Sequence, residues 1–233
     1  MTSLRENLAR VTERIRDAER RAGRPPNSVR LVAVTKGVSA ERVTEAIAAG
    51  ARILGENRVQ EAFAKRPLVA GEAEWHLIGH LQTNKAPRAL ETFDVIQSVD
   101  SPRLAREIDD RASRDGRRVP VLVEVNVSGE SSKTGVTPED FFRLLEAMAP
   151  LGGIETRGLM AMGPLTADEG AIRQAFARLR WLGEAAALQG LVATRDRPVE
   201  LSMGMSDDFE AAILEGSTMV RIGRALFGPR PTA

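Results

Sequence analysis

Apolar residues recur along the chain with two different spacings, and the change between them divides the sequence into elements. The first series lies four, three and four residues apart: Leu4, Leu8, Val11 and Ile15. That spacing is typical of one face of a helix, and residues 3–6 (SLRE) have the form of a capping box at its start. We therefore predict an amphipathic N-terminal helix within residues 1–24, ended by Gly23 and the prolines that follow it.

Beyond this helix, short apolar runs alternate with helical stretches. The runs begin near Leu31, Arg52, Trp75, Asp94, Val119, Ile154, Val199 and Met219. Helical stretches follow at residues 40–49, 57–66, 83–91, 101–114, 138–149, 168–188 and 207–215, with a shorter one from Arg224. Eight strand–helix units in roughly 200 residues predict a (β/α)8 barrel. A doubly wound open sheet is the alternative, but it usually has fewer strands and a G-x-G-x-x-G turn, which follows none of these runs.

The pattern thus predicts an α/β protein with one domain over residues 1–233. Its core is a single TIM barrel at residues 30–228, preceded by the extra N-terminal helix. No linker rich in Pro, Gly or Ser divides the series of units. We therefore expect any functional site to lie at the mouth of this barrel, where the C-terminal ends of the strands meet.

The composition excludes several classes of function. The formal net charge of +1 provides no attraction to nucleic acid or to an anionic membrane surface. The chain contains no cysteine, which excludes disulfides and thiolate metal sites. No apolar stretch reaches the ~18 residues that a membrane span requires, and acidic residues near the N-terminus argue against a transit peptide. We expect a cytoplasmic protein, and a monomer.

Lys36 is the strongest candidate for chemistry. It follows the apolar run at residues 31–34 with only Thr35 between them. Apolar surroundings disfavour an ammonium and lower its pKa, which makes the neutral amine available for a Schiff base with a carbonyl. The other lysines of the chain are Lys65, Lys85 and Lys133. Lys85 and Lys133 lie in polar segments that favour the ammonium, so they are secondary candidates.

The predicted ends of strands 7 and 8 carry groups that suit a phosphate. Ser206 can either cap the next helix or face an anion at the start of that helix. Gly223 allows a backbone N–H to approach a phosphate oxygen, and Arg224 opens the following helix. Asp207 and Asp208 would repel an anion, so we expect them to point away.

A lysine amine and a phosphate site at one barrel mouth are what pyridoxal 5′-phosphate (PLP) requires. Arg221, near the end of strand 8, could face the pyridine nitrogen of this cofactor. An arginine there would keep the nitrogen unprotonated and weaken the ring as an electron sink. A salt bridge across the barrel mouth is the alternative role for Arg221. His76 and His80 lie too far apart on a strand to share a metal ion, so we expect no metal site.

Seven segments, in order along nearly the whole chain, match the motifs of a known family. They are residues 31–37 (LVAVTKG), 55–60 (GENRVQ), 75–85 (WHLIGHLQTNK), 123–135 (VEVNVSGESSKTG), 157–162 (RGLMAM), 201–208 (LSMGMSDD) and 220–228 (VRIGRALFG). With these segments the chain resembles the pyridoxal phosphate homeostasis protein family (the YggS/PROSC type). The resemblance implies a barrel related to the alanine racemase N-terminal domain, with PLP bound to Lys36.

The resemblance also implies roles for the other residues at the mouth. Ser206 and the backbone of Gly223 and Arg224 would contact the phosphate, Arg221 would face the pyridine nitrogen, and Asn57 would line the pocket. One position departs from the family pattern, because Arg224 stands where such proteins often have a small hydroxyl residue. The departure removes a side-chain contact to the phosphate and leaves the backbone N–H in place.

The choice between enzyme and carrier depends on what the chain lacks. Racemases of the similar fold use a tyrosine as the second base, and this chain has none. They also complete their site with a second domain, for which only residues 229–233 remain after the eight units. We therefore expect a non-catalytic protein that holds PLP and takes part in its homeostasis, by buffering it or supplying apo-enzymes. The alternative is a PLP-dependent amino-acid racemase, in which His80 would be one general acid in place of the missing tyrosine.

Overall fold

Each apolar run beyond residue 30 forms a parallel strand, and the strands close into a barrel. The computed structural model describes residues 3–130, 133–193 and 198–229. The strands pair in sequence order, and β1 also pairs with β8. They are β1 Arg30–Val34, β2 Ile53–Glu56, β3 Glu74–Leu77, β4 Val95–Val99, β5 Val119–Glu124, β6 Ile154–Met160, β7 Glu200–Ser202 and β8 Met219–Ile222. The predicted TIM barrel is confirmed.

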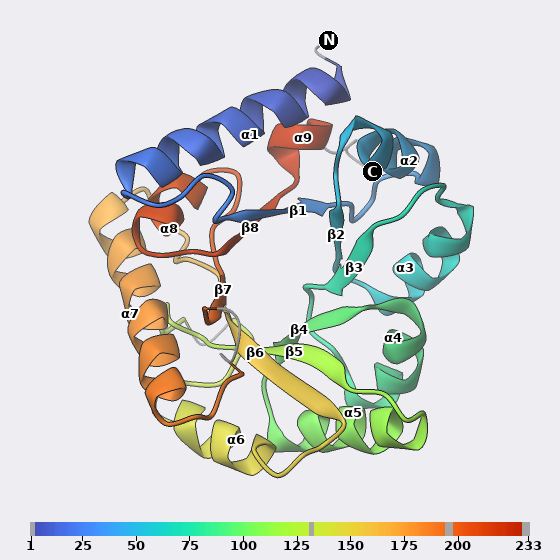
Figure 1. Ribbon diagram of the computed structural model, residues 1–233, viewed down its shortest axis with the longest axis vertical. Coiled ribbons are helices and arrows are strands. Elements are labelled where there is room, and N and C mark those ends of the chain that lie inside the picture. Colours follow the sequence, from blue (N-terminus) through green and yellow to red (C-terminus); the bar gives the residue numbers. More distant parts are fainter. Residues whose placement is uncertain (1–2, 131–132, 194–197, 230–233) are drawn as a thin grey trace.

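Helices form an outer ring around the strands (Figure 1). They are α1 Leu4–Arg21, α2 Ala40–Ala49, α3 Val59–Lys65, α4 Ala86–Thr92, α5 Pro102–Arg114, α6 Phe141–Met148, α7 Glu169–Leu188, α8 Phe209–Leu214 and α9 Arg224–Phe227. Two short 3-10 helices, η1 Arg66–Leu68 and η2 Thr83–Lys85, precede β3 and α4. The core fills the space between strands and helices, where the large side chains of Phe93, Phe141, Phe176 and Phe209 are fully buried.

One predicted helix is divided in the structure. The sequence predicted a single helix over residues 83–91, whereas the chain forms η2 and then α4. Pro87 lies in the first turn of α4. In a helix running from residue 83, its nitrogen would have to donate to the carbonyl of Thr83, and proline has no N–H. The helix therefore begins just before Pro87.

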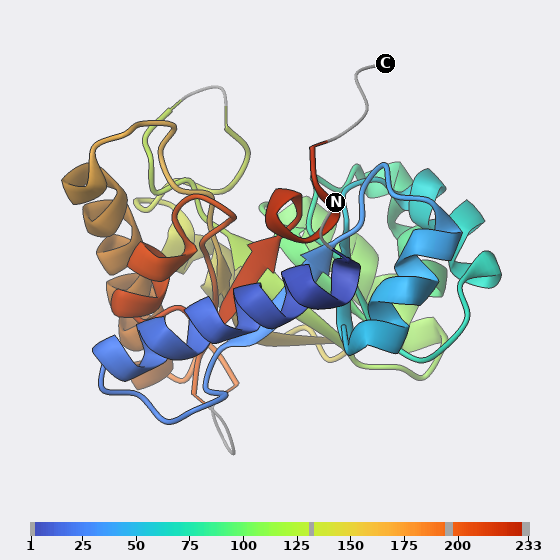
Figure 2. The same ribbon diagram turned by 90° about the horizontal axis from the view of Figure 1, so that it is seen from above.

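The extra N-terminal helix α1 begins with the predicted capping box. The Glu6 N–H donates to Ser3 Oγ at 3.2 Å, and the Ser3 N–H donates to Glu6 Oε2 at 2.7 Å. The helix buries one face, which carries Val11, Ile15 and Ala18. It lies outside the barrel against α8, α9 and α2, as Figures 1 and 2 both show. In this position α1 supports the two helices that follow β7 and β8.

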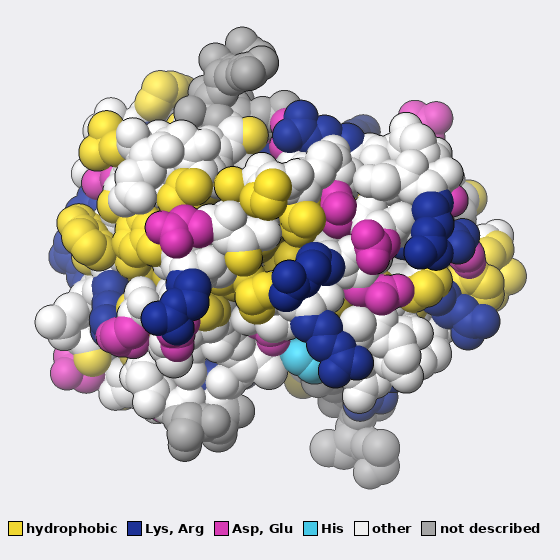
Figure 3. Space-filling view, turned by 90° about the horizontal axis from the view of Figure 1, so that it is seen from below, with side chains coloured by type: hydrophobic (Ala, Val, Ile, Leu, Met, Phe, Trp, Pro, Cys, Tyr) yellow, Lys and Arg dark blue, Asp and Glu magenta, His cyan; other side chains and the backbone are white. Residues whose placement is uncertain are grey.

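The surface carries charges of both signs, as expected from the small net charge. On the face shown in Figure 3, Lys and Arg side chains alternate with Asp and Glu side chains, and a histidine lies beside basic residues. Within the described part of the chain, no helix is long and apolar enough to cross a membrane.

Candidate functional site

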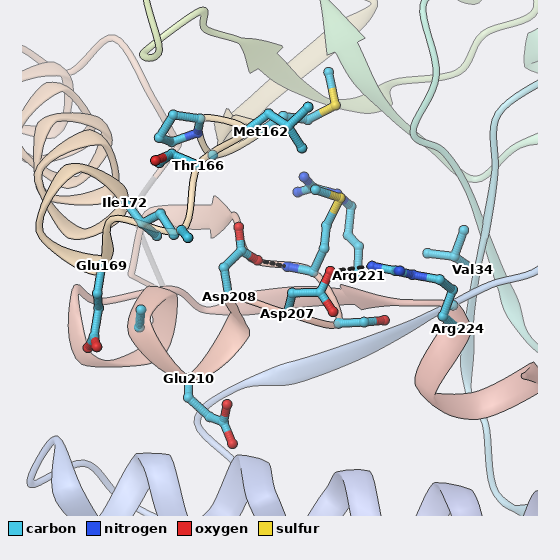
Figure 4. A pocket seen from close by; sticks show the side chains of 18 of the residues that line it. Val34, Met162, Thr166, Glu169, Ile172, Asp207, Asp208, Glu210, Arg221 and Arg224 are labelled. Atoms are coloured by element: carbon cyan, nitrogen blue, oxygen red, sulfur yellow. Dashed lines mark hydrogen bonds and ion pairs between the residues drawn. The ribbon is translucent and has the colours of Figure 1, made fainter. Parts of the chain in front are cut away.

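The polar residues predicted at the strand ends line one cavity at the mouth of the barrel. Its volume is about 760 Å³, which lies in the range of ~300–1,000 Å³ usual for small-molecule sites. All of the predicted site residues line it: Lys36, Asn57, Ser206, Arg221, Gly223 and Arg224. Figure 4 shows part of the cavity wall. The fold thus brings together residues that follow or end β1, β2, β7 and β8, while their individual roles stay predictions.

Lys36 lies in the turn that directly follows β1 and is half-buried on the cavity wall. Gly37, the next residue, has a left-handed φ of 70°. A side chain at this φ would be strained, so glycine allows the chain to reverse immediately after the lysine. Val34 and Ile78 line the same cavity and make part of the surroundings of the lysine apolar.

Arg221 projects from β8 and is fixed by oxygen atoms at the end of β7 and just after β6. Its Nη1 donates to the carbonyl and hydroxyl oxygens of Ser202 at 2.7 and 2.9 Å, and its Nη2 donates to the Ala161 carbonyl at 2.8 Å. Burial lowers the pKa of Arg221 to about 10, against the opposing effect of Asp208 and Glu124. The guanidinium therefore stays protonated at neutral pH. Its bonds go to neutral oxygens rather than to the carboxylate that the salt-bridge alternative requires.

A chain of buried polar side chains supports Ser202 from inside the barrel. Ser202 Oγ donates to Gln97 Oε1 at 2.7 Å, and Gln97 Nε2 lies 2.6 Å from His76 Nδ1. All three residues are fully buried. Since Gln97 accepts through its oxygen, its amide nitrogen donates to His76, which fixes Nδ1 as the acceptor. The chain holds Ser202, and through it the orientation of Arg221.

The turn after β7 forms another side of the cavity. Asp208 Oδ1 accepts the N–H of Met205 at 2.5 Å, and the Asp208 N–H donates to the Met205 carbonyl at 3.2 Å. Ser206 lies within this turn and is half-buried. The N-cap residue of α8 is Asp208, with no side-chain capping bond. Ser206 is therefore not the plain N-cap that was the alternative to an anion contact.

Asp207 and Asp208 both line the cavity, whereas the sequence predicted that they point away from it. Each carboxylate has a partner that reduces repulsion of an anion. Asp207 forms an ion pair with Arg224, drawn in Figure 4. Burial raises the pKa of Asp208, against the effects of the Met205 N–H and the charge of Arg221. Asp208 therefore takes up a proton at a higher pH than an aspartate in water does.

The junction of β8 and α9 presents backbone N–H groups to the cavity region. Gly223 is the N-cap residue of α9, and Arg224 is its first residue. The first N–H groups of a helix have no acceptor within that helix. The N–H groups here can therefore donate to an anion, while the side chain of Arg224 remains with Asp207.

Asn57 follows β2 and lies against the loop after β3. A Cβ atom at Gly79 would lie 2.3 Å from the Asn57 carbonyl oxygen, so only glycine allows this close packing. Asn57 also lines a smaller cavity of about 240 Å³, together with His80 and Lys85. Lys85 is thus adjacent to the main site without lining it.

The remaining candidates have structural partners. Lys133 Nζ donates to Glu130 Oε1 at 2.6 Å and to the Gly163 carbonyl at 2.9 Å. His80 Nδ1 lies 3.3 Å from Asp100 Oδ2. Among the residues that the structure describes, no cluster of His, Cys, Asp and Glu could hold a metal ion.

Sequence reasoning gave no role to Lys65, which the structure buries beneath the Lys36 turn. Its side chain is 8% exposed, and its Nζ lies 2.6 Å from Glu56 Oε1 and 2.9 Å from Glu61 Oε1. The spacing of four residues between Glu61 and Lys65 on a helix is the signal that could have indicated part of this cluster.

The donors around the cavity fit PLP. An amine suits its aldehyde, a buried guanidinium suits the ring nitrogen, and a serine hydroxyl with backbone N–H groups suits its phosphate. The groups come from separate strand ends around one mouth, as a ligand with different functions at its two ends requires.

The chain is similar to known proteins over nearly its whole length. Residues 7–231 match the family described as alanine racemase, N-terminal domain. A protein of Pseudomonas aeruginosa called pyridoxal phosphate homeostasis protein is 46% identical over 99% of this chain and 97% of its own length. The structure of PipY from Synechococcus elongatus with PLP bound is 37% identical, has a TM-score of 0.82, and covers 97% of this chain and 100% of that one.

Alanine racemase structures share the fold at much lower identity. The enzyme from Clostridium difficile is 18% identical with a TM-score of 0.74, and the match covers 98% of this chain and 57% of the enzyme. At this identity the similarity is evidence for a common barrel and says nothing about a common reaction.

Proposed function

Since the chain belongs to the family of pyridoxal phosphate homeostasis proteins, we propose that it binds PLP at its barrel mouth and takes part in PLP homeostasis. The observation that carries this proposal is the convergence of the predicted site residues on one cavity of about 760 Å³. PLP supplies an aldehyde that condenses reversibly with an amine, together with a phosphate that anchors the other end of the ring.

Lys36 is the residue that we assign to the aldehyde. Its neutral amine would hold the cofactor, whose aldehyde would supply reversible condensation with an amine and release of one water. We assign Arg221 to the pyridine nitrogen, to which it would donate, and Asn57 to the lining of the ring. The fixed guanidinium of Arg221 supports this assignment, because its bonds to Ser202 and Ala161 leave it little freedom to reorient.

The phosphate is assigned to the turns after β7 and β8. The hydroxyl of Ser206 and the N–H groups of Gly223 and Arg224 donate to its oxygens. Hydrogen bonds to an ionised acceptor are about twice as strong as neutral ones. The ion pair between Asp207 and Arg224 supports a backbone contact at Arg224 rather than a side-chain contact.

We assign a carrier role rather than amino-acid turnover. A guanidinium with a pKa of about 10 keeps its proton at neutral pH, so it does not protonate the pyridine nitrogen. An unprotonated ring is a weak electron sink, which disfavours removal of a substrate Cα proton. The racemase alternative is less favoured, since the 233 residues contain no tyrosine to act as the second base.

Buffering requires that PLP be released as well as bound. We propose that the protein acts as a single domain and a monomer in the cytoplasm, and that it exchanges PLP with PLP-dependent apo-enzymes during transient contact. The mixed charges of the face in Figure 3 and the net charge of +1 support a role away from membranes and nucleic acid.

The assignment of Lys36 is tested by trapping the Schiff base. We expect the protein with PLP to show a visible absorption band, and borohydride to fix one equivalent of cofactor covalently. Lys36→Ala should abolish the fixed adduct, because no other lysine lines the larger cavity in the described part of the chain. Lys85→Ala is the matched control and should retain the adduct. A full equivalent of adduct on Lys36→Ala would show that the assignment is wrong.

A further inference from the structure

A buried ionic cluster lies beneath the turn that carries Lys36. The ammonium of Lys65 bonds Glu56 Oε1 at 2.6 Å and Glu61 Oε1 at 2.9 Å. The Glu56 side chain is fully buried, whereas the Glu61 side chain is 30% exposed. The residues come from the end of β2 and from α3, and neither Lys65 nor the two carboxylates line the PLP cavity. The cluster therefore needs a role other than direct contact with the ligand.

The cluster bonds the residues on both sides of Lys36. Before the lysine, the carbonyl of Thr35 accepts from Lys65 Nζ at 2.8 Å, and the Thr35 hydroxyl donates to Glu56 Oε1 at 2.8 Å. After the lysine, the N–H of Gly37 donates to Glu61 Oε1 at 2.6 Å. The backbone is thus held at the residue before and at the residue after the reactive amine.

The charges of this cluster depend on one another. Burial raises the pKa of Glu56, although Lys65 and Thr35 oppose this effect. Burial also acts to raise the pKa of Glu61, but the Gly37 N–H and Lys65 outweigh it, and the pKa of Glu61 is lowered. The lowered pKa of Glu61 keeps this carboxylate ionised at neutral pH. Removing one member of a buried cluster leaves the others without compensation.

We propose that Lys65 and Glu61 are positioning residues that fix the Thr35–Gly37 turn, so that the Lys36 amine reaches the aldehyde carbon of PLP. The proposal rests on the proposed function of Lys36. Correct placement of a nucleophile contributes to the rate of the covalent step and much less to non-covalent affinity. Lys65 itself is bonded to Glu56 and Glu61 and does not form the adduct.

The test separates the covalent step from binding. We would mix PLP with the full-length protein and follow the visible band in time. We would also measure the affinity for pyridoxine 5′-phosphate, which has the ring and the phosphate but no aldehyde. In Glu61→Ala the Gly37 N–H loses its acceptor, so band formation should slow by about tenfold or more, with pyridoxine 5′-phosphate affinity changed by less than about twofold.

The control variants distinguish positioning from general damage. Glu61→Gln keeps an oxygen acceptor for Gly37 and should restore the rate to within about threefold of the wild-type value. Glu45→Ala removes an exposed glutamate of α2 and should change neither quantity. Lys65→Met is a second test of the cluster, and the partly exposed Glu61 keeps the experiment informative if Lys65→Met does not fold.

Two results would overturn the proposal. One is an unchanged rate of band formation in Glu61→Ala, and the other is an equal loss of rate and of pyridoxine 5′-phosphate affinity, which indicates a purely structural role. Failure of the proposed function is separate from both, because wild-type protein would then show no band that Lys36→Ala removes.

Discussion

At the scale of single residues, the two lysines near the end of β1 differ in what surrounds them. Lys65 is bonded to Glu56 and Glu61, which stabilise its ammonium. Lys36 lies on the wall of the cavity, where a ligand can reach it. Burial alone therefore does not select the nucleophile. Its selection requires access to the ligand, which the position of Lys36 on the cavity wall provides.

Glu124 provides a pH-dependent test at this scale. Burial raises its pKa, against the hydrogen bond from Thr134, and Asp100 adds to the rise while Arg221 and His80 oppose it. A raised pKa in the folded state means that ionisation costs stability as the pH rises from the unfolded value of ~4.3 through the folded value. Glu124→Gln removes this cost and keeps an acceptor for Thr134.

We therefore expect Glu124→Gln to be more stable than the wild type at pH 7, with the difference vanishing as the pH falls toward ~4. A gain of about 1 kcal/mol would raise the Tm by roughly 2–4 °C in a protein of this size. Thermal unfolding of the cofactor-free proteins between pH 4 and pH 8 measures it. A difference that grows toward acid pH would contradict the assigned direction of the shift.

At the scale of elements, the proposed phosphate site combines the turns after β7 and β8. Its proposed donors are the hydroxyl of Ser206 and the N–H groups at the start of α9. We expect pyridoxal, which lacks the phosphate, to bind at least ~100-fold more weakly than PLP, because hydrogen bonds to a charged group contribute about 1.5–3 kcal/mol each. Ser206→Ala should weaken PLP by about tenfold and leave pyridoxal unchanged. Equal losses for both ligands would place Ser206 away from the phosphate.

Element boundaries show where sequence reasoning succeeds and where it stops. The alternation of runs predicted every strand of the barrel, because a parallel strand buried on both faces reads as a continuous apolar run. A continuous apolar run does not show which of its side chains point into the barrel. The buried chain that His76 and Gln97 form with Ser202 could therefore not be predicted from the sequence. Pairing across strands distant in sequence decides that arrangement.

At the scale of the whole molecule, the barrel places cavity residues by closing strand β8 against β1. Closure brings Arg221 into register with Val32, four residues before Lys36. Strand order and spacing were enough to predict that Lys36, Arg221 and Gly223 share a mouth. On the cavity wall Asp207 forms an ion pair with Arg224, a contact between side chains of different turns that no local pattern encodes.

The balance between carrier and enzyme is also a property of the whole molecule, and it yields the last prediction. The Arg221 guanidinium keeps its proton at neutral pH, so under the proposed contact with the pyridine nitrogen the bound ring would stay a weak electron sink. In D₂O with L-alanine, we expect Cα exchange to be at least ~1,000-fold slower than the ~10 s⁻¹ typical of enzymes. Mass spectrometry of the amino acid measures it, with transfer of PLP to an apo-enzyme followed in parallel. Exchange near enzymatic rates, or accumulation of D-alanine, would favour a racemase, whereas transfer without exchange is what a buffer for PLP requires.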